Sequence, residues 1–239
     1  MNQDLTTGKP SRVLWKFCLP LFGSIIFQQL YNIADSFVAG KFIGENALAA
    51  VGVVGRVAMF TILPLIGMSI AVQPLLGFNY GAKLWHRVKK TLAVGMLGAT
   101  IIGTVLWVLI MVFAAQIIGF FGITDAALVD LSAFALRVNL IFLPIIGFQI
   151  VGSNYFQATG QPTKSIILSM TRQILFLIPL YIALPIFLPV WFPQYTGLDA
   201  LYFAVPVADF LAIFTALVFI LIERGRLHKL ETGEIEAKY

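Results

Sequence analysis

Long apolar runs, separated by short polar segments, dominate this chain. No charged residue occurs between Val57 and Ala82, or between Thr91 and Thr124. A helix needs about 20 mainly apolar residues to cross a hydrocarbon layer about 30 Å thick. The pattern predicts six such helices, over Leu14–Gly40, Ala47–Phe78, Thr91–Thr124 with a short turn at its end, Leu128–Ala158, Ser165–Leu188 and Leu198–Ile222. We therefore expect an all-α integral membrane protein, with a six-helix transmembrane domain (residues 14–222) between a polar N-terminal segment (1–13) and a charged tail (223–239).

The first predicted helix carries a polar stripe inside its apolar run. Ser24, Gln28, Asn32 and Asp35 recur at steps of four, four and three residues, which puts them on one helical face, and Tyr31 shares that stripe. An ionisable side chain in a span costs at least about 2.5 kcal/mol and is functional by default. We expect Asp35 to bind a proton or cation, with Gln28, Tyr31 and Asn32 beside it. The alternative is that Asp35 pairs with an arginine and only holds the bundle together.

Four other charged side chains fall inside the predicted spans. By helical rise, Arg137 reaches a depth at which it could pair with Asp35. Arg172 and Asp209 form the second plausible pair, with Arg56 as a competitor for Asp209. For all four residues we favour a role in structural ion pairs, and Asp209 is also a candidate for a substrate cavity.

The fourth predicted helix carries Gln149, Ser153 and Gln157 at intervals of four residues. This spacing places the three side chains on one face. They could line a wet cavity that receives substrate, or they could form interhelix hydrogen bonds. The spacing alone does not separate these alternatives.

The composition of the chain and the distribution of its charges indicate its environment and its orientation in the membrane. The chain is 59% hydrophobic and only 11% charged, which is typical of a membrane protein. Nearly all Lys and Arg residues outside the spans fall on the side of the N-terminus, so the positive-inside rule predicts that both termini are cytoplasmic. The net charge of +5 thus reflects topology, and we expect the partner to be the lipid bilayer and not nucleic acid.

Motifs for catalysis, ATP hydrolysis and metal binding are missing from the sequence. It contains no GxxxxGKS or GxxxxGKT, no HExxH and no GxSxG, and its lone Cys18 excludes a CxxC site. His86 and His228 lie among basic residues in hydrophilic segments. We expect neither an enzyme nor a bound cofactor or metal, apart from a coupling ion.

Several stretches of the chain resemble the multidrug and toxin extrusion (MATE) transporters. The opening stretch LWKFCLPLFGSIIFQQLYNIADSFVAGKFIGENALAAVG, with Pro20, Asp35 and Gly40, resembles the first helix of their first lobe. The remainder is similar to their second lobe, on the stretches GFNYGA, SNYFQATGQP, SMTRQILFLIPL and PVADF. The resemblance covers about residues 12 to 224, and the two parts join near residues 47–52.

This resemblance implies a secondary efflux transporter of the bacterial plasma membrane. Such a protein would exchange H⁺ or Na⁺, bound at Asp35, for hydrophobic, often cationic, drug-like molecules. Family members enclose their cavity between two six-helix lobes, so a single lobe would need a second copy in a homodimer. The alternatives are a non-transporting half-lobe, whether a deletion product, a scaffold or a partner subunit, and a flippase for lipid-linked precursors.

Overall fold

A computed structural model describes residues 45–123, 125–191 and 197–235, together with Ser11, Trp15, Cys18, Leu19, Phe22, Gly23, Ile26 and Gln29. The described residues contain helices and no strand. The helices are α2 (Glu45–Gly81), α3 (Trp85–Phe120), α4 (Ala126–Asn139), α5 (Leu143–Ala158), α6 (Pro162–Met170), the π-helical segment η1 (Thr171–Leu177), α7 (Ile178–Trp191) and α8 (Gly197–Glu231).

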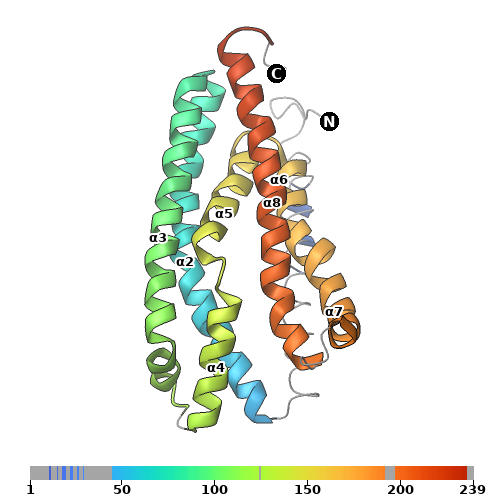
Figure 1. The fold of residues 1–239 in the computed structure, drawn as a ribbon. Coiled ribbons are helices and arrows are strands. Elements are labelled where there is room, and N and C mark those ends of the chain that lie inside the picture. The colour runs from blue at the N-terminus through green and yellow to red at the C-terminus, as the bar shows by residue number, and fades with distance from the viewer. Residues whose placement is uncertain are drawn as a thin grey trace.

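The helices run up and down in one bundle (Figure 1). α2 and α3 form an antiparallel pair, and α5 packs against both of them. α8 contacts α7 and η1 on one side and α3, α4 and α5 on the other. The α2–α3 turn, the α5–α6 turn and the C-terminal end of α8 all lie at the same end of the bundle, which we call the basic end (Figure 1).

Three helices in the described part of the chain are long and apolar enough to cross a membrane: α2, α3 and α8. The pair α4 and α5 passes the same test together but bends by 46° at its break. Large apolar side chains such as Phe78, Phe120 and Ile222 are exposed on the outside. Exposed hydrocarbon on spanning helices fits a surrounding bilayer, and the expectation of an all-α membrane protein is confirmed.

The single helix predicted over Leu128–Ala158 is wrong in detail, because the structure divides it at residues 140–142. Pro144 stands at the start of α5. Proline has no N–H to donate, and its ring collides with the carbonyl group four residues earlier, which is that of Leu140. The helix therefore ends before this proline and restarts at a new angle.

Two later helices also differ from their predicted form. The predicted span Ser165–Leu188 is helical from Pro162 to Trp191 but contains the π-helical segment η1. α8 continues to Glu231, past the predicted end at Ile222. Its last turns therefore belong to the bundle, although we expected them in a separate tail.

Small residues allow close helix packing in the interior. A Cβ atom added to Gly147 on α5 would lie 2.8 Å from the carbonyl oxygen of Ala99 on α3. On α8, four fully buried alanines recur every four residues: Ala204, Ala208, Ala212 and Ala216. Close approach through small side chains is the usual way in which helices associate in membranes, and it fixes how the charged side chains of α8 face their neighbours.

Candidate functional site

The polar stripe of the first predicted helix lies outside the described residues. This applies to Gln28, Tyr31, Asn32 and Asp35, and hence to the expected pair between Asp35 and Arg137. Their roles stay predictions.

Arg137 contacts the backbone of a neighbouring helix. Its Nε donates a 3.2 Å hydrogen bond to the carbonyl oxygen of Met111 on α3. Phe113, two residues further on, leaves helical geometry with φ −106° and ψ 17°. The guanidinium group therefore donates a hydrogen bond to a carbonyl oxygen next to a local break in α3. This contact fits a structural role for Arg137.

Arg172 and Asp209 form an ion pair between η1 and α8. Arg172 Nε donates to Asp209 Oδ1. Asp209 is completely buried, and its second oxygen, Oδ2, has no hydrogen-bond partner among the described residues. Arg56, the competitor for this partner, is exposed on α2. Within the described chain, the structure thus brings Arg172 to Asp209 and forms no ion pair with Arg56.

Two interruptions of regular helix and a proline within α8 lie around this pair, and we call the place the hinge layer. Arg172 lies within η1, and Pro206 lies within α8, three residues before Asp209. The ring of Phe142, in the break between α4 and α5, lies 6.1 Å from the ring of Phe210, measured between centroids. Irregular backbone at membrane depth is tolerated only where protein covers it or where it lines a cavity, and π-helical turns often mark functional sites.

Of the polar row on α5, Ser153 has clear partners. Its Oγ lies 3.0 Å from Ser169 Oγ and 3.3 Å from Ser165 Oγ, both on α6. Gln149 is buried and Gln157 half-buried. These contacts fit interhelix hydrogen bonding for Ser153, whereas the two glutamines remain candidates for a cavity.

A second buried carboxylate, Glu223, was not among the expected site residues. It is 1% exposed and lies in the C-terminal part of α8, toward the basic end of the bundle. Lys164 Nζ donates to its Oε2 at 2.8 Å, while Gln161 Nε2 and Tyr155 OH donate to its Oε1 at 3.1 and 3.3 Å. Arg226 Nη1 lies 3.3 Å from Oε1. The sequence shows this residue as an acid directly after a long apolar run, at the start of the predicted charged tail (223–239), and nothing in the local pattern indicates its burial.

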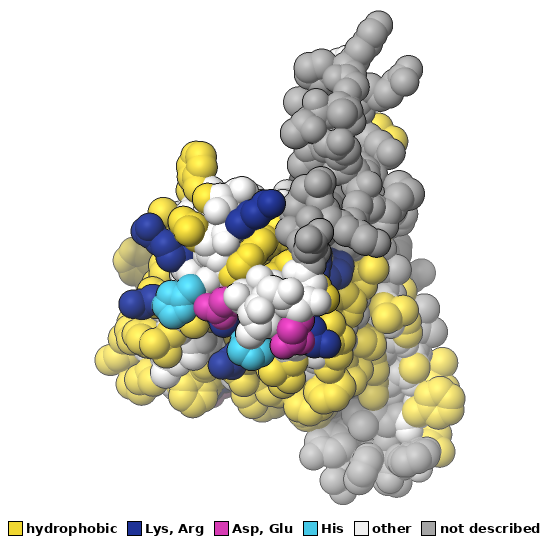
Figure 2. All heavy atoms as spheres, turned by 90° about the horizontal axis from the view of Figure 1, so that it is seen from above, with side chains coloured by type: hydrophobic (Ala, Val, Ile, Leu, Met, Phe, Trp, Pro, Cys, Tyr) yellow, Lys and Arg dark blue, Asp and Glu magenta, His cyan; other side chains and the backbone are white. Residues whose placement is uncertain are grey.

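Figure 2 shows the basic end from above, with Lys and Arg side chains distributed around the face and a few acidic side chains between them. Glu231, the last residue of α8, pairs there with Lys89 of α3. His86 Nδ1 lies 3.5 Å from the same carboxylate. Together with Glu223, this pair ties the end of α8 to α3 and α6.

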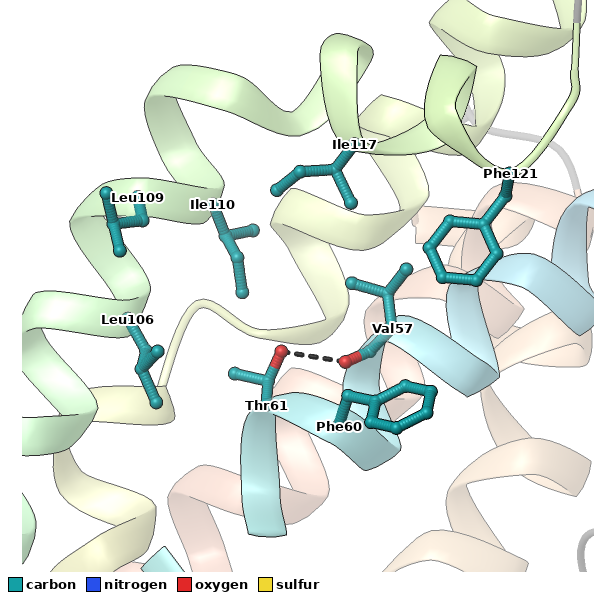
Figure 3. A pocket seen from close by; sticks show the side chains of 8 residues that line it. All are labelled: Val57, Phe60, Thr61, Leu106, Leu109, Ile110, Ile117 and Phe121. Carbon is teal, nitrogen blue, oxygen red and sulfur yellow. Dashed lines mark hydrogen bonds between the residues drawn. The ribbon is translucent and has the colours of Figure 1, made fainter. Parts of the chain in front are cut away.

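An apolar crevice of about 340 Å³ lies between α2 and α3 (Figure 3). Its walls include Phe60, Leu106 and Ile110, and its one hydroxyl group, that of Thr61, already donates to the carbonyl oxygen of Val57 at 2.7 Å. Such a surface suits hydrocarbon and offers no ligand to a cation. Among the described residues, no group of three or more His, Cys, Asp or Glu side chains could hold a metal ion.

Comparison with known proteins gives the family. The model of the MatE family matches residues 20–182, more than half of the chain. The multidrug export protein MepA of Staphylococcus saprophyticus is 25% identical over 215 residues, which are 90% of this chain and 45% of that protein. MepA of Staphylococcus aureus is 24% identical over 98% of this chain and 50% of its own length.

Solved structures show the same fold. The MATE multidrug transporter DinF-BH is 32% identical and matches with a TM-score of 0.73 over 86% of this chain and 44% of that one. An outward-facing multidrug resistance MATE family transporter of the MOP superfamily matches with a TM-score of 0.78 at 24% identity, over 95% of this chain and 50% of that one. The chain thus spans about half the length of the relatives that it matches. It is a multi-pass membrane protein and belongs to the MatE family.

Proposed function

We propose that this chain acts in secondary active efflux, exporting hydrophobic, often cationic, drug-like molecules in exchange for H⁺ or Na⁺. The observation that carries the proposal is its membership of the MatE family, with relatives named as multidrug export proteins that match along 90% of the chain or more. The long apolar helices and the interrupted backbone of the hinge layer support it, because broken helices are typical of transporter binding sites.

Ion exchange would supply the energy for this export. A membrane potential provides about 2.3 kcal/mol per charge per 100 mV, and a tenfold concentration ratio costs about 1.4 kcal/mol. A net inward movement of one charge per molecule exported, as when a neutral molecule is exchanged for one ion, therefore sustains a gradient of about 40-fold at 100 mV. Exchange of a monovalent cation for one ion moves no net charge and is driven by the concentration ratio of the ion instead. No ATP-binding motif is needed for such coupling.

Asp35 is the proposed coupling residue, with Gln28, Tyr31 and Asn32 as its neighbours on the same helical face. A carboxylate that alternates between free and neutralised states suits a site exposed first to one side of the membrane and then to the other. Gln149 and Gln157 on α5 are the proposed polar contacts for substrate.

The proposed assembly is a homodimer in the bacterial plasma membrane. One lobe supplies one wall of a cavity, and a second copy related by two-fold symmetry would supply the other. The basic end of the bundle, where Lys and Arg gather (Figure 2), would face the cytoplasm together with both termini, as the positive-inside rule requires.

Reconstitution into proteoliposomes tests this proposal. The purified chain should export ethidium, a hydrophobic cationic dye of the proposed substrate class, when an inward H⁺ or Na⁺ gradient is imposed. The variant Asp35→Asn should lose the gradient-driven flux while keeping its helical content. Asp130→Asn, which changes an exposed aspartate on α4, is the matched control and should keep the flux.

Two results would contradict the proposal. Unchanged flux in Asp35→Asn would remove the coupling role of that residue. A chain that stays monomeric in the bilayer and moves no ethidium under either gradient would leave a non-transporting half-lobe as the explanation.

A further inference from the structure

We propose that Asp209 is a proton-binding switch, which holds the hinge layer in one conformation while ionised and releases it when a proton binds to Oδ2. This inference deepens the proposed function, because it gives the described part of the chain a second group that responds to the coupling ion. It starts from the buried oxygen Oδ2, which has no hydrogen-bond partner among the described residues.

Glu223 shows why the open oxygen of Asp209 is notable. Both acids lie on α8, both are at least 99% buried, and both pair with a cation of another segment. Each oxygen of Glu223 accepts at least one hydrogen bond, whereas only one oxygen of Asp209 does so. A buried carboxylate oxygen without a partner costs free energy, and binding a proton removes the charge that makes this cost high.

A proton fits this place better than a metal cation. Na⁺ requires several oxygen ligands around it, whereas the hydrogen-bond partner that the described residues give Asp209 is Arg172, a cation that carries donors and no acceptor. A proton needs one lone pair only. The chemistry at Oδ2 therefore favours H⁺ over Na⁺.

Arg172 is the charged group that opposes protonation of Asp209. α8 is also packed against α3, α4, α5, α6 and α7. The charged side chains of α3 lie at the basic end, where Lys89 pairs with Glu231, and Lys164 of α6 pairs with Glu223. α4 carries Asp130 and Arg137, the latter bound to the backbone of α3, and α5 and α7 carry no Asp, Glu, Lys, Arg or His.

The position of the pair explains how one proton could move helices. Arg172 belongs to η1, and Asp209 follows Pro206 within α8. When Oδ2 gains a proton, the carboxyl group becomes neutral, and its bond to Arg172 loses the charge on the acceptor side. η1 is then held less firmly to α8, at the level where the α4–α5 break contacts α8 through Phe142 and Phe210.

Hydrogen–deuterium exchange on the full chain in detergent tests this switch without any transport. Protection of the η1 amides, corrected for the intrinsic effect of pH, should fall about tenfold or more between pH 8 and pH 5, as expected for losing one charge-assisted hydrogen bond. Asp209→Asn should show low protection at both pH values. Glu223→Gln, the matched buried acid on the same helix, should keep the pH dependence at η1.

The inference fails if wild-type protection at η1 does not depend on pH, or if Asp209→Asn keeps the wild-type dependence. Should Asp209→Asn not fold, Arg172→Gln takes its place, and low protection of η1 at both pH values is again expected; a retained pH dependence overturns the proposal. A pH-dependent η1 without ethidium flux rejects the transport proposal alone. Gradient-driven flux with a pH-independent η1 rejects this switch alone.

Discussion

Lys164 on α6 donates a 2.8 Å hydrogen bond from Nζ to Oε2 of Glu223 on α8, a carboxylate that is 1% exposed. The α5–α6 turn brings these residues together. Gly160 in this turn adopts a positive φ of 70°, and Pro162 then starts α6. The signature stretch that ends in Gly-Gln-Pro thus delivers Gln161 and Lys164 to one buried acid.

Lys164→Met should destabilise the protein more than Lys89→Met does. The first change takes one donor from a buried carboxylate, and a hydrogen bond to a charged group is worth about 1.5–3 kcal/mol. The second breaks a partly exposed pair with Glu231, for which less than about 1 kcal/mol is typical. Thermal unfolding in detergent gives the comparison, and equal losses for the two variants would show that burial of Glu223 does not matter.

Gly147→Ala should cost about 1–3 kcal/mol, the usual penalty for overpacking a core. The new methyl group would lie 2.8 Å from the carbonyl oxygen of Ala99, so α3 and α5 must move apart. Gly119→Ala on α3 is the control, because nothing lies within 4 Å of its Cβ position. It should be neutral or slightly stabilising, since Ala favours a helix over Gly. Chemical or thermal unfolding measures both, and a neutral Gly147→Ala would refute the tight contact.

Ser153→Ala should lower stability by about 0.6 kcal/mol, the average for a hydrogen bond between membrane helices. Its hydroxyl group links α5 to Ser165 and Ser169 of α6. The hydroxyl group of Thr104 bonds to the carbonyl oxygen of Thr100 in its own helix, so Thr104→Ala should change less. If Ser153→Ala instead lowers the ethidium flux while the free energy of unfolding stays unchanged, this residue lines a polar cavity wall.

Cysteine labelling in intact cells tests the proposed orientation. In a Cys18→Ser background, a membrane-impermeant thiol reagent should label Ala126→Cys, which lies at the end of the bundle opposite to the basic end. Lys83→Cys, in the turn between α2 and α3, should react only after the membrane is opened, because the positive-inside rule places this turn in the cytoplasm. Both positions are exposed in the structure. The reverse pattern would invert the topology.

One buried contact could be inferred from the sequence, by estimating how deep each charged residue lies in the membrane. Helical rise put Arg172 and Asp209 forward as a plausible pair, and the two side chains do meet. The same estimate could not decide between Arg172 and Arg56, because depth says nothing about which helix faces turn toward each other. The place of Asp35 lies outside the described residues, so its role rests on the sequence and the resemblance.

What the sequence determined by itself was the solvent, the helical class and the family. A bilayer leaves no water for backbone groups, so long apolar runs must become helices whatever their neighbours are. The tertiary structure alone decided the break at residues 140–142, the π-helical turn around Arg172 and the burial of Glu223 at the end of α8. Each of these depends on contacts between segments far apart in the chain, such as Lys164 with Glu223. Local pattern carries no record of such contacts, because the same polar residue is stable in solvent or in a core according to the partners that packing brings to it.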